Sequence, residues 1–218
     1  MSRRRNKLLL VEGAKDKRVI PYLMEKNGVD WPRGGEPVSI EIIGSNKLAK
    51  SDAAAFYKQP ELEKLGIILD ADSDAEATWR NIAELFGTHV PEFPRDVVVD
   101  GFISKPTQEN IRFGVWIMPD NRSRGMLETF LHFLVRNEHD QLWQHACDAT
   151  DKASENFAAP YKPVHVDKAR IHTYLAWQDE PGAQLHEAVN YAILDPLSPY
   201  CQPFVTWFKT LFDLDAKP

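Results

Sequence analysis

The sequence is poor in cysteine and has no long hydrophobic run, and each absence excludes a class of protein. Its 218 residues include two cysteines, Cys147 and Cys201, which form no CxxC motif. A disulfide framework is therefore excluded, and both thiols are expected to be reduced and buried in a cytoplasmic protein. No apolar stretch approaches the roughly 20 residues that cross a membrane. The apolar run at 8–11 is also too short for the core of a signal peptide.

An excess of positive charge is also missing. With 26 basic and 32 acidic residues, the formal net charge is −6. This balance argues against a surface coated in basic residues for nonspecific nucleic-acid binding. Short basic clusters remain, which are either solvated faces or local contacts for a phosphate backbone: 3–7, 15–18, 47–50, 122/124 and 162–170.

Nucleotide-binding glycine motifs are absent too. The turn at 44–47 could present backbone N–H groups to a phosphate, which makes Lys47 a candidate substrate contact. The chain has no P-loop pattern and no GxGxxG, so ATP hydrolysis is not expected. Any coupling to ATP would come from a partner ATPase.

Short apolar runs alternate with helical patterns over the first part of the chain. Strands are predicted at 7–12, 38–43, 65–69, 97–103 and 113–118, and helices at about 15–27, 45–57, 75–86 and 126–135. This alternation predicts an α/β domain over residues 1–136, with a mostly parallel sheet and helices on both faces.

Sequence patterns typical of strands are absent from the remainder of the chain. Helical stretches lie near 138–150, 167–177, 182–193 and 200–212. Residues 137–218 are therefore predicted to form a helical extension packed on the first domain. Its aromatic last segment is expected to pack on the core, and it could also pack against a second copy in a homodimer.

Two of the predicted strands end in carboxylates. Glu12 is the last residue of the first strand, and Asp70 and Asp72 follow the third. The carboxyl ends of parallel strands meet at one edge of a sheet, where open α/β folds keep their sites. Carboxylates gathered there repel one another. Alternate residues at a strand end point the same way, so we expect Asp70 and Asp72 to point alike and to hold a divalent cation, Mg²⁺ or Mn²⁺.

Neighbouring residues supply further candidates. Burial of Glu12 would suit it to proton transfer or metal bridging. Gly13 would let a substrate backbone come close, and Lys15 begins a basic cluster. Asp74 is either a further metal ligand or the cap of the helix that follows. Asp16 lies four residues beyond Glu12, and a helix N-terminal role explains it equally well.

Glu12-Gly13 and the Asp70-Ala71-Asp72 motif, 58 positions after Glu12, together resemble the toprim domain. Topoisomerases, bacterial primases, recombination mediators and OLD-type nucleases share this domain, which has a Rossmann-like fold. The resemblance covers roughly 7–135. It implies that Glu12 is a general acid/base or metal ligand and that the aspartates hold Mg²⁺ near a scissile phosphate.

Two later segments are similar to OLD-like and small stand-alone toprim proteins. The strand at 114–118 is followed by Leu127-Glu128, and Glu128 would complete a second cation site at the same edge. The alternative is that Glu128 is an ordinary carboxylate at a helix N-terminus with no metal-binding role. OLD-like nucleases place a lysine after the toprim core, so the resemblance implies a catalytic role for Lys168. Lys168 and His172 are one helical turn apart and could meet a phosphate.

These observations favour a metal-dependent nuclease acting on DNA or RNA. Two alternatives stay open. One is a toprim module that binds nucleic acid or a partner without turnover. The other is a phosphatase, because residues 67–72 also resemble the first motif of the haloacid-dehalogenase family, in which Asp70 would be the nucleophile.

Overall fold

A computed structural model of the chain describes residues 6–44 and 49–214. Its centre is a five-stranded sheet in the order β2-β1-β3-β5-β4. The strands are β1 (Lys7–Val11), β2 (Ser39–Ile42), β3 (Lys64–Asp70), β4 (Phe102–Ile103) and β5 (Arg112–Met118). All neighbours pair in parallel except β4 and β5, which are antiparallel. The predicted α/β class and mostly parallel sheet are confirmed.

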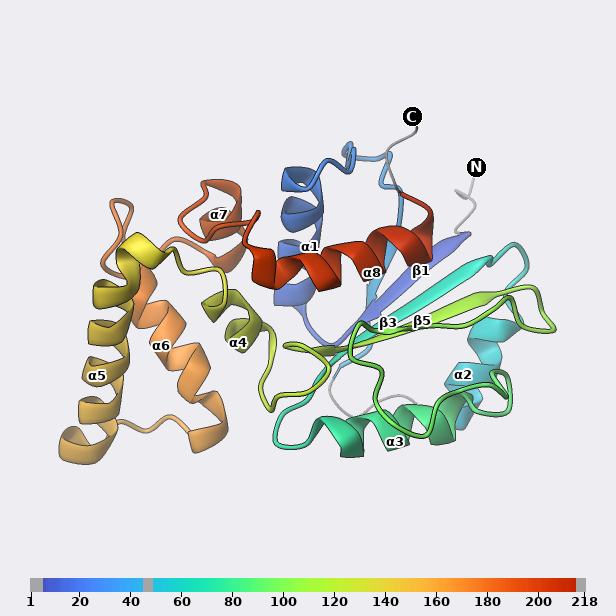
Figure 1. Ribbon diagram of the computed structural model, residues 1–218, viewed down its shortest axis with the longest axis horizontal. Helices are drawn as coiled ribbons and strands as arrows, with labels where there is room; N and C mark the ends of the chain where they lie inside the picture. The colour runs from blue at the N-terminus through green and yellow to red at the C-terminus, as the bar shows by residue number, and fades with distance from the viewer. Residues whose placement is uncertain (1–5, 45–48, 215–218) are drawn as a thin grey trace.

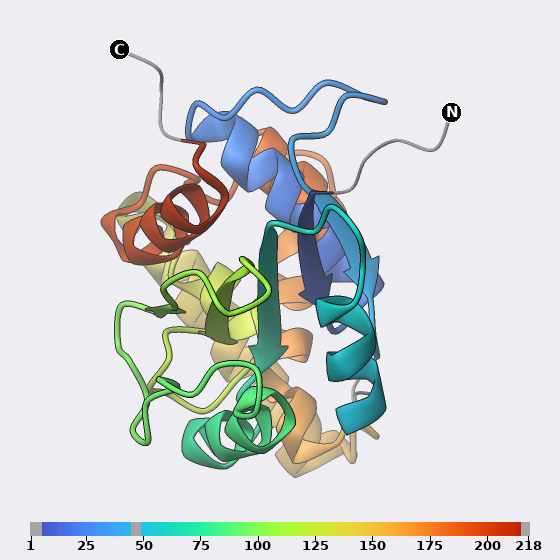
Figure 2. The same ribbon diagram turned by 90° about the vertical axis from the view of Figure 1, so that its right-hand side faces the viewer.

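Helices cover both faces of this sheet. Helices α1 (Ala14–Lys26) and α8 (Gln202–Phe212) lie on one face, and α2 (Lys50–Tyr57) and α3 (Ala75–Phe86) lie on the other (Figure 1 and Figure 2). The central strands are buried on both sides, which explains their unbroken apolar runs. Within β1, Leu9 packs into the core on the α1 and α8 face, and Leu10 packs into the core on the opposite face.

Helix α8 lies directly on the sheet, as the aromatic content of its sequence predicted. Gly66 and Gly114 make room for it, because a Cβ on Gly114 would come within 2.6 Å of Leu211. Trp207 anchors the same helix, since its indole N–H donates to the Phe102 carbonyl at 3.0 Å.

The remaining helices extend beyond the carboxyl ends of the strands. They are α4 (Leu127–His132), α5 (Asp140–Phe157), α6 (Val166–Leu175) and α7 (Leu185–Asn190). The strands point towards α4 and α6, and α7 packs against α1 (Figure 1). The division into domains at residue 136 stays a prediction.

Several predicted elements differ in extent from the observed ones; for example, the helix predicted near 138–150 runs to Phe157, and the one near 182–193 covers only Leu185–Asn190. The strand predicted at 97–103 is reduced to Phe102–Ile103, because the chain turns at Val98–Gly101 and Gly101 has a positive φ of 79°. Val97 and Val98 pack against the core without pairing. The helix predicted at 126–135 ends at His132. The predicted start of the second helix, at 45, lies outside the described residues.

Two further findings concern the absences in the sequence. Cys147 and Cys201 are both free, as predicted, but only Cys201 is buried and Cys147 is half-buried. Among the described residues, the helices are all too short or too polar to cross a membrane.

Candidate functional site

Glu12 and Asp70 meet at the carboxyl edge of neighbouring strands. The parallel pairing of β1 with β3 sets Val11 opposite Ile68, so both strands end at nearly the same level. The Oε2 atom of Glu12 accepts a hydrogen bond from the Asp70 backbone N–H at 2.9 Å. Oδ1 of Asp70 accepts in turn from the Leu127 N–H at 3.1 Å. These bonds connect β1, β3 and the start of α4.

Two more acidic residues face this edge from helix N-termini. Asp16 lies in the first turn of α1 and is 6% exposed, and Glu128 lies in the first turn of α4 and is 3% exposed. Oδ2 of Asp16 accepts from the Gly13 N–H at 2.9 Å. We refer to Glu12, Asp16, Asp70 and Glu128 as the carboxylate cluster.

Burial and mutual repulsion raise the pKa of three members of this cluster, Glu12, Asp16 and Asp70. Burial, reinforced by the charges of Asp16, Glu12, Glu128 and Asp72, raises the pKa of Asp70 to about 9. Burial also raises the pKa of Asp16 to about 6, against the hydrogen bond from Gly13. The pKa of Glu12 is raised by burial as well, and the hydrogen bond from Asp70 opposes that shift. The cluster therefore cannot ionise fully at neutral pH without added positive charge.

Two lysines supply part of that charge. Nζ of Lys15 lies 2.8 Å from Oε1 of Glu128, and Nζ of Lys168 lies 3.7 Å from the same oxygen. Nε2 of His172 is 3.2 Å from the Lys15 amine. Burial and then the Lys15 charge lower the pKa of His172, which favours the neutral imidazole. The predicted Lys168 and His172 pair thus lies beside the predicted Glu128.

A hydrogen-bonded network fixes the helix that carries Lys168. Thr129 donates from Oγ1 to Oδ2 of Asp167 at 2.6 Å, which ties α4 to α6. Arg170 contacts both carboxylate oxygens of Asp151 at 2.9 and 3.0 Å, which ties α6 to α5. Because Thr129 and Asp167 are the chain neighbours of Glu128 and Lys168, this network sets the spacing of the latter pair.

The two remaining aspartates of the motif lie outside the cluster. Strand β3 ends at Asp70, and Asp72 has a left-handed φ of 49° and an exposed side chain. The expectation that Asp70 and Asp72 continue one strand and point alike is therefore wrong. Asp72 is still close enough to raise the pKa of Glu12 and of Asp70. Asp74 caps α3, since its Oδ1 accepts from the Ala77 N–H at 3.1 Å.

Of the other predicted substrate contacts, one lies at the site and one cannot be placed. Gly13 is the residue immediately before α1, so it lies at the edge of the cluster, whereas Lys47 lies outside the described residues. From the sequence, a helix N-terminal role explained Asp16 as well as its spacing from Glu12 did, so Asp16 was not among the predicted site residues. A signal was present, because Asp16 stands three and four positions before the buried Val19 and Ile20 and so faces inward.

The cluster is not a preassembled coordination shell. Within 6–44 and 49–214, no three His, Cys, Asp or Glu side chains are arranged as they would be around a metal ion. What the described residues provide is a set of oxygen donors with more negative than positive charge.

Comparison with known proteins gives a family and no closer relative. No curated protein matches the sequence, and no solved structure matches it either. A family profile, described as a protein of unknown function (DUF3226), matches residues 6–213. This match spans nearly the whole chain, so the protein belongs to the DUF3226 family.

Proposed function

We propose that this protein is a metal-dependent nuclease that hydrolyses phosphodiester bonds in nucleic acid. One observation carries the proposal: Glu12, Asp70 and Glu128, far apart in the sequence, converge on the carboxyl edge of a parallel sheet beside Lys15 and Lys168. Acidic groups for a cation and basic groups for a phosphate thus stand together. This is the combination that phosphodiester hydrolysis requires.

The resemblance to toprim domains supports the same proposal. The order of Glu12-Gly13 and Asp70-Ala71-Asp72 is that of the toprim motifs, and the sheet brings Glu12 and Asp70 together. By this resemblance, Glu12 and the aspartates act on a scissile phosphate. The proposal also includes a separate partner ATPase, as in OLD-like systems, which would supply any coupling to ATP.

The chemistry of the donor set fits Mg²⁺ or Mn²⁺. Carboxylate oxygens are the ligands that these hard cations prefer. Among the described residues, the cations paired with the cluster are Lys15 and Lys168, which its four carboxylates outnumber. Glu12, Asp70 and Asp72 would hold the ion, with Glu128 beside them. Such an ion, when bound, activates water and stabilises the charge of the leaving oxygen.

The chain's own residues would share the other tasks. Lys15 and Lys168 would leave Glu128 in part to contact the non-bridging oxygens of the phosphate and stabilise its developing charge. Glu12, held by the Asp70 N–H through Oε2, would take a proton from the attacking water. Neutral His172 would keep the Lys15 amine oriented through its Nε2 atom.

Cleavage assays test the proposal. The purified chain with Mn²⁺ should nick supercoiled plasmid or cut a single strand, and Asp70→Asn should abolish this activity. Glu84→Gln, an exposed change on α3, serves as the matched control and should cut normally. Metal binding without any cleavage would instead favour the non-catalytic module. A covalent phosphate trapped on Asp70 would favour the phosphatase.

A further inference from the structure

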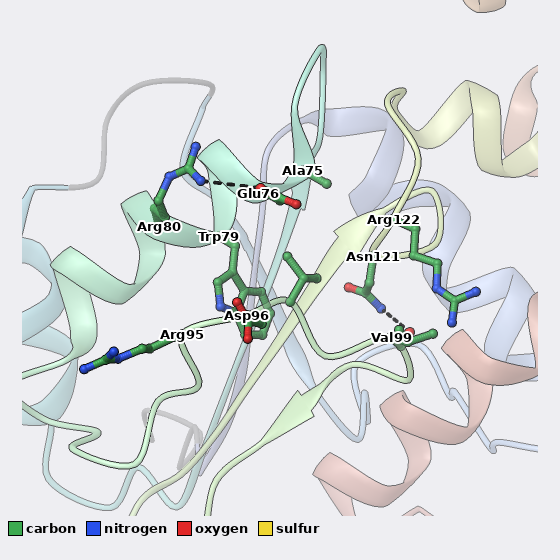
Figure 3. Close-up of a pocket in the computed structure, with 10 residues that line it drawn as sticks. Ala75, Glu76, Trp79, Arg80, Arg95, Asp96, Val99, Asn121 and Arg122 are labelled. Carbon is green, nitrogen blue, oxygen red and sulfur yellow. Dashed lines mark hydrogen bonds and ion pairs between the residues drawn. The ribbon is translucent and has the colours of Figure 1, made fainter.

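A cavity of about 560 Å³ opens beside the carboxyl edge of the sheet, on the side away from the carboxylate cluster. Its walls come from the start of α3, the loop before β4 and the turn after β5. Its volume falls in the range of small-molecule sites. The lining residues are Ala75, Glu76, Trp79, Arg80, Arg95, Asp96, Val97, Val99, Asn121 and Arg122 (Figure 3).

Arginines surround an apolar floor in this cavity. Trp79 is 1% exposed and holds its position because its indole N–H donates to the Pro94 carbonyl at 2.9 Å. In Figure 3, Arg95 and Arg122 stand on opposite sides of Trp79 and Val99. Val99, which is 38% exposed, is the accessible part of this floor, and a ring could rest on it while the arginines contact anionic groups at the rim.

Two of the arginines have no carboxylate partner. Arg80 pairs with Glu76 at 3.6 Å and with Asp74 at 3.9 Å. Among the described residues, the guanidinium groups of Arg95 and Arg122 form no ion pair, and both residues are exposed. With Glu76 engaged by Arg80, only Asp96 offsets them, so the lining carries a net positive charge in a chain whose net charge is −6.

The cavity and the carboxylate cluster share a wall. Asp72 and Gly125 exchange two backbone hydrogen bonds of 2.9 Å, which join the loop after β3 to the turn after β5. Asp70, on one side of this wall, belongs to the cluster. Ala75, three residues after Asp72, and Arg122, three residues before Gly125, line the cavity. The loop after β3 thus runs from the cluster at Asp70 to the cavity at Ala75.

We propose that this cavity binds one nucleotide unit of the substrate strand, adjacent to the phosphate held at the carboxylate cluster. The base lies on the exposed Val99 above the buried Trp79, and the flanking phosphates contact Arg95 and Arg122. This assignment rests on the proposed nuclease function. It adds the place at which the protein holds the substrate strand. The chemistry recognised, an aromatic ring with phosphate, is shared with a free mononucleotide.

Strand affinity tests the assignment separately from catalysis. Binding of a short fluorescein-labelled single strand is measured by anisotropy in the Asp70→Asn background, in which the strand is not cleaved. Adding Arg95→Ala and Arg122→Ala together should weaken binding about tenfold and lower the salt slope by about 0.7 for each arginine. Val99→Trp, which fills the mouth of the cavity, should weaken binding without any change in charge. Arg33→Ala removes the same charge from the loop before β2, at the opposite end of the sheet, and should have no effect.

Each result supports or overturns the proposal. Loss of affinity in the cavity variants but not in Arg33→Ala supports it. Unchanged affinity in those variants, or no strand binding at all, overturns it. An unlabelled 5′-mononucleotide that competes better than an unlabelled strand would assign the cavity to a free nucleotide and also overturn it. If Asp70→Asn leaves cleavage intact while the cavity variants lose affinity, the nuclease mechanism fails and the binding site stands.

Discussion

The buried carboxyl of Asp70 makes the stability of the metal-free protein depend on pH. Its pKa rises from 3.8 to about 9 on folding, mainly because the group is buried. The folded state therefore binds a proton that the unfolded state has lost at any pH between these values. The sign follows from linkage: stability falls as pH rises through this window, because the unfolded state binds fewer protons.

The size of the change in unfolding free energy follows from the single proton that Asp70 binds in each folded molecule. Each pH unit inside the window costs about 1.4 kcal/mol, so a rise from about pH 5 to about pH 7 should cost about 3 kcal/mol through Asp70. Asp70→Asn replaces the neutral carboxyl with a group of the same shape that does not titrate. The variant should therefore gain about 3 kcal/mol relative to wild type over the same interval. Asp16, with a pKa of about 6, leaves a smaller slope in both proteins.

Urea unfolding in EDTA measures this difference. The free energy of unfolding is compared at several pH values for wild type, Asp70→Asn and the control Glu84→Gln. The control should run parallel to wild type, and Asp70→Asn should give a flatter line. If Asp70→Asn and wild type run parallel, the carboxyl of Asp70 titrates outside this window and the account of the cluster's electrostatics is wrong.

Three further changes test other parts of the structure. Lys168→Ala should slow cleavage at least tenfold in plasmid nicking while Mn²⁺ affinity changes little, because the proposed mechanism uses the lysine to contact the phosphate; equal rates would remove it from the site. Thr129→Val breaks the 2.6 Å bond to Asp167 and should lower the unfolding free energy in urea by about 1–3 kcal/mol; an unchanged value would show that the α4–α6 link contributes nothing. Gly114→Ala should cost about 1–3 kcal/mol in thermal unfolding through its clash with Leu211, and adding Leu211→Ala should cost less than the sum of the two single changes; strict additivity would contradict the contact.

The parts of the fold that follow from periodic patterning could be predicted from the sequence. The apolar runs of β1, β3 and β5 and the amphipathic pattern of α1 are local signals, and the order of strands and helices implies a parallel sheet. The strand prediction failed over residues 97–101 because valine side chains can pack against the core without their backbone pairing with another strand. Burial alone does not supply a hydrogen-bonding neighbour, and the turn at Gly101 allows only two residues to reach β5.

The candidate site was predictable to the same degree. Glu12 and Asp70 end adjacent strands, and strand alternation with parallel pairing brings such residues together. The closeness of Lys15 to Glu128, 113 positions later, depends on how α4 and α6 pack, which no local pattern encodes. The displacement of Asp72 depends on its left-handed backbone and its pairing with Gly125, which alternation could not reveal.

Calorimetric titration with Mn²⁺ tests the central proposal most directly. At neutral pH, wild type and Glu84→Gln should bind Mn²⁺ and release protons as the carboxylate cluster ionises, and the heat should therefore depend on the ionisation enthalpy of the buffer. Asp70→Asn should lose both the binding and the buffer dependence. Equal Mn²⁺ affinity in Asp70→Asn and wild type would contradict the proposal that the carboxyl edge of the sheet is a metal site.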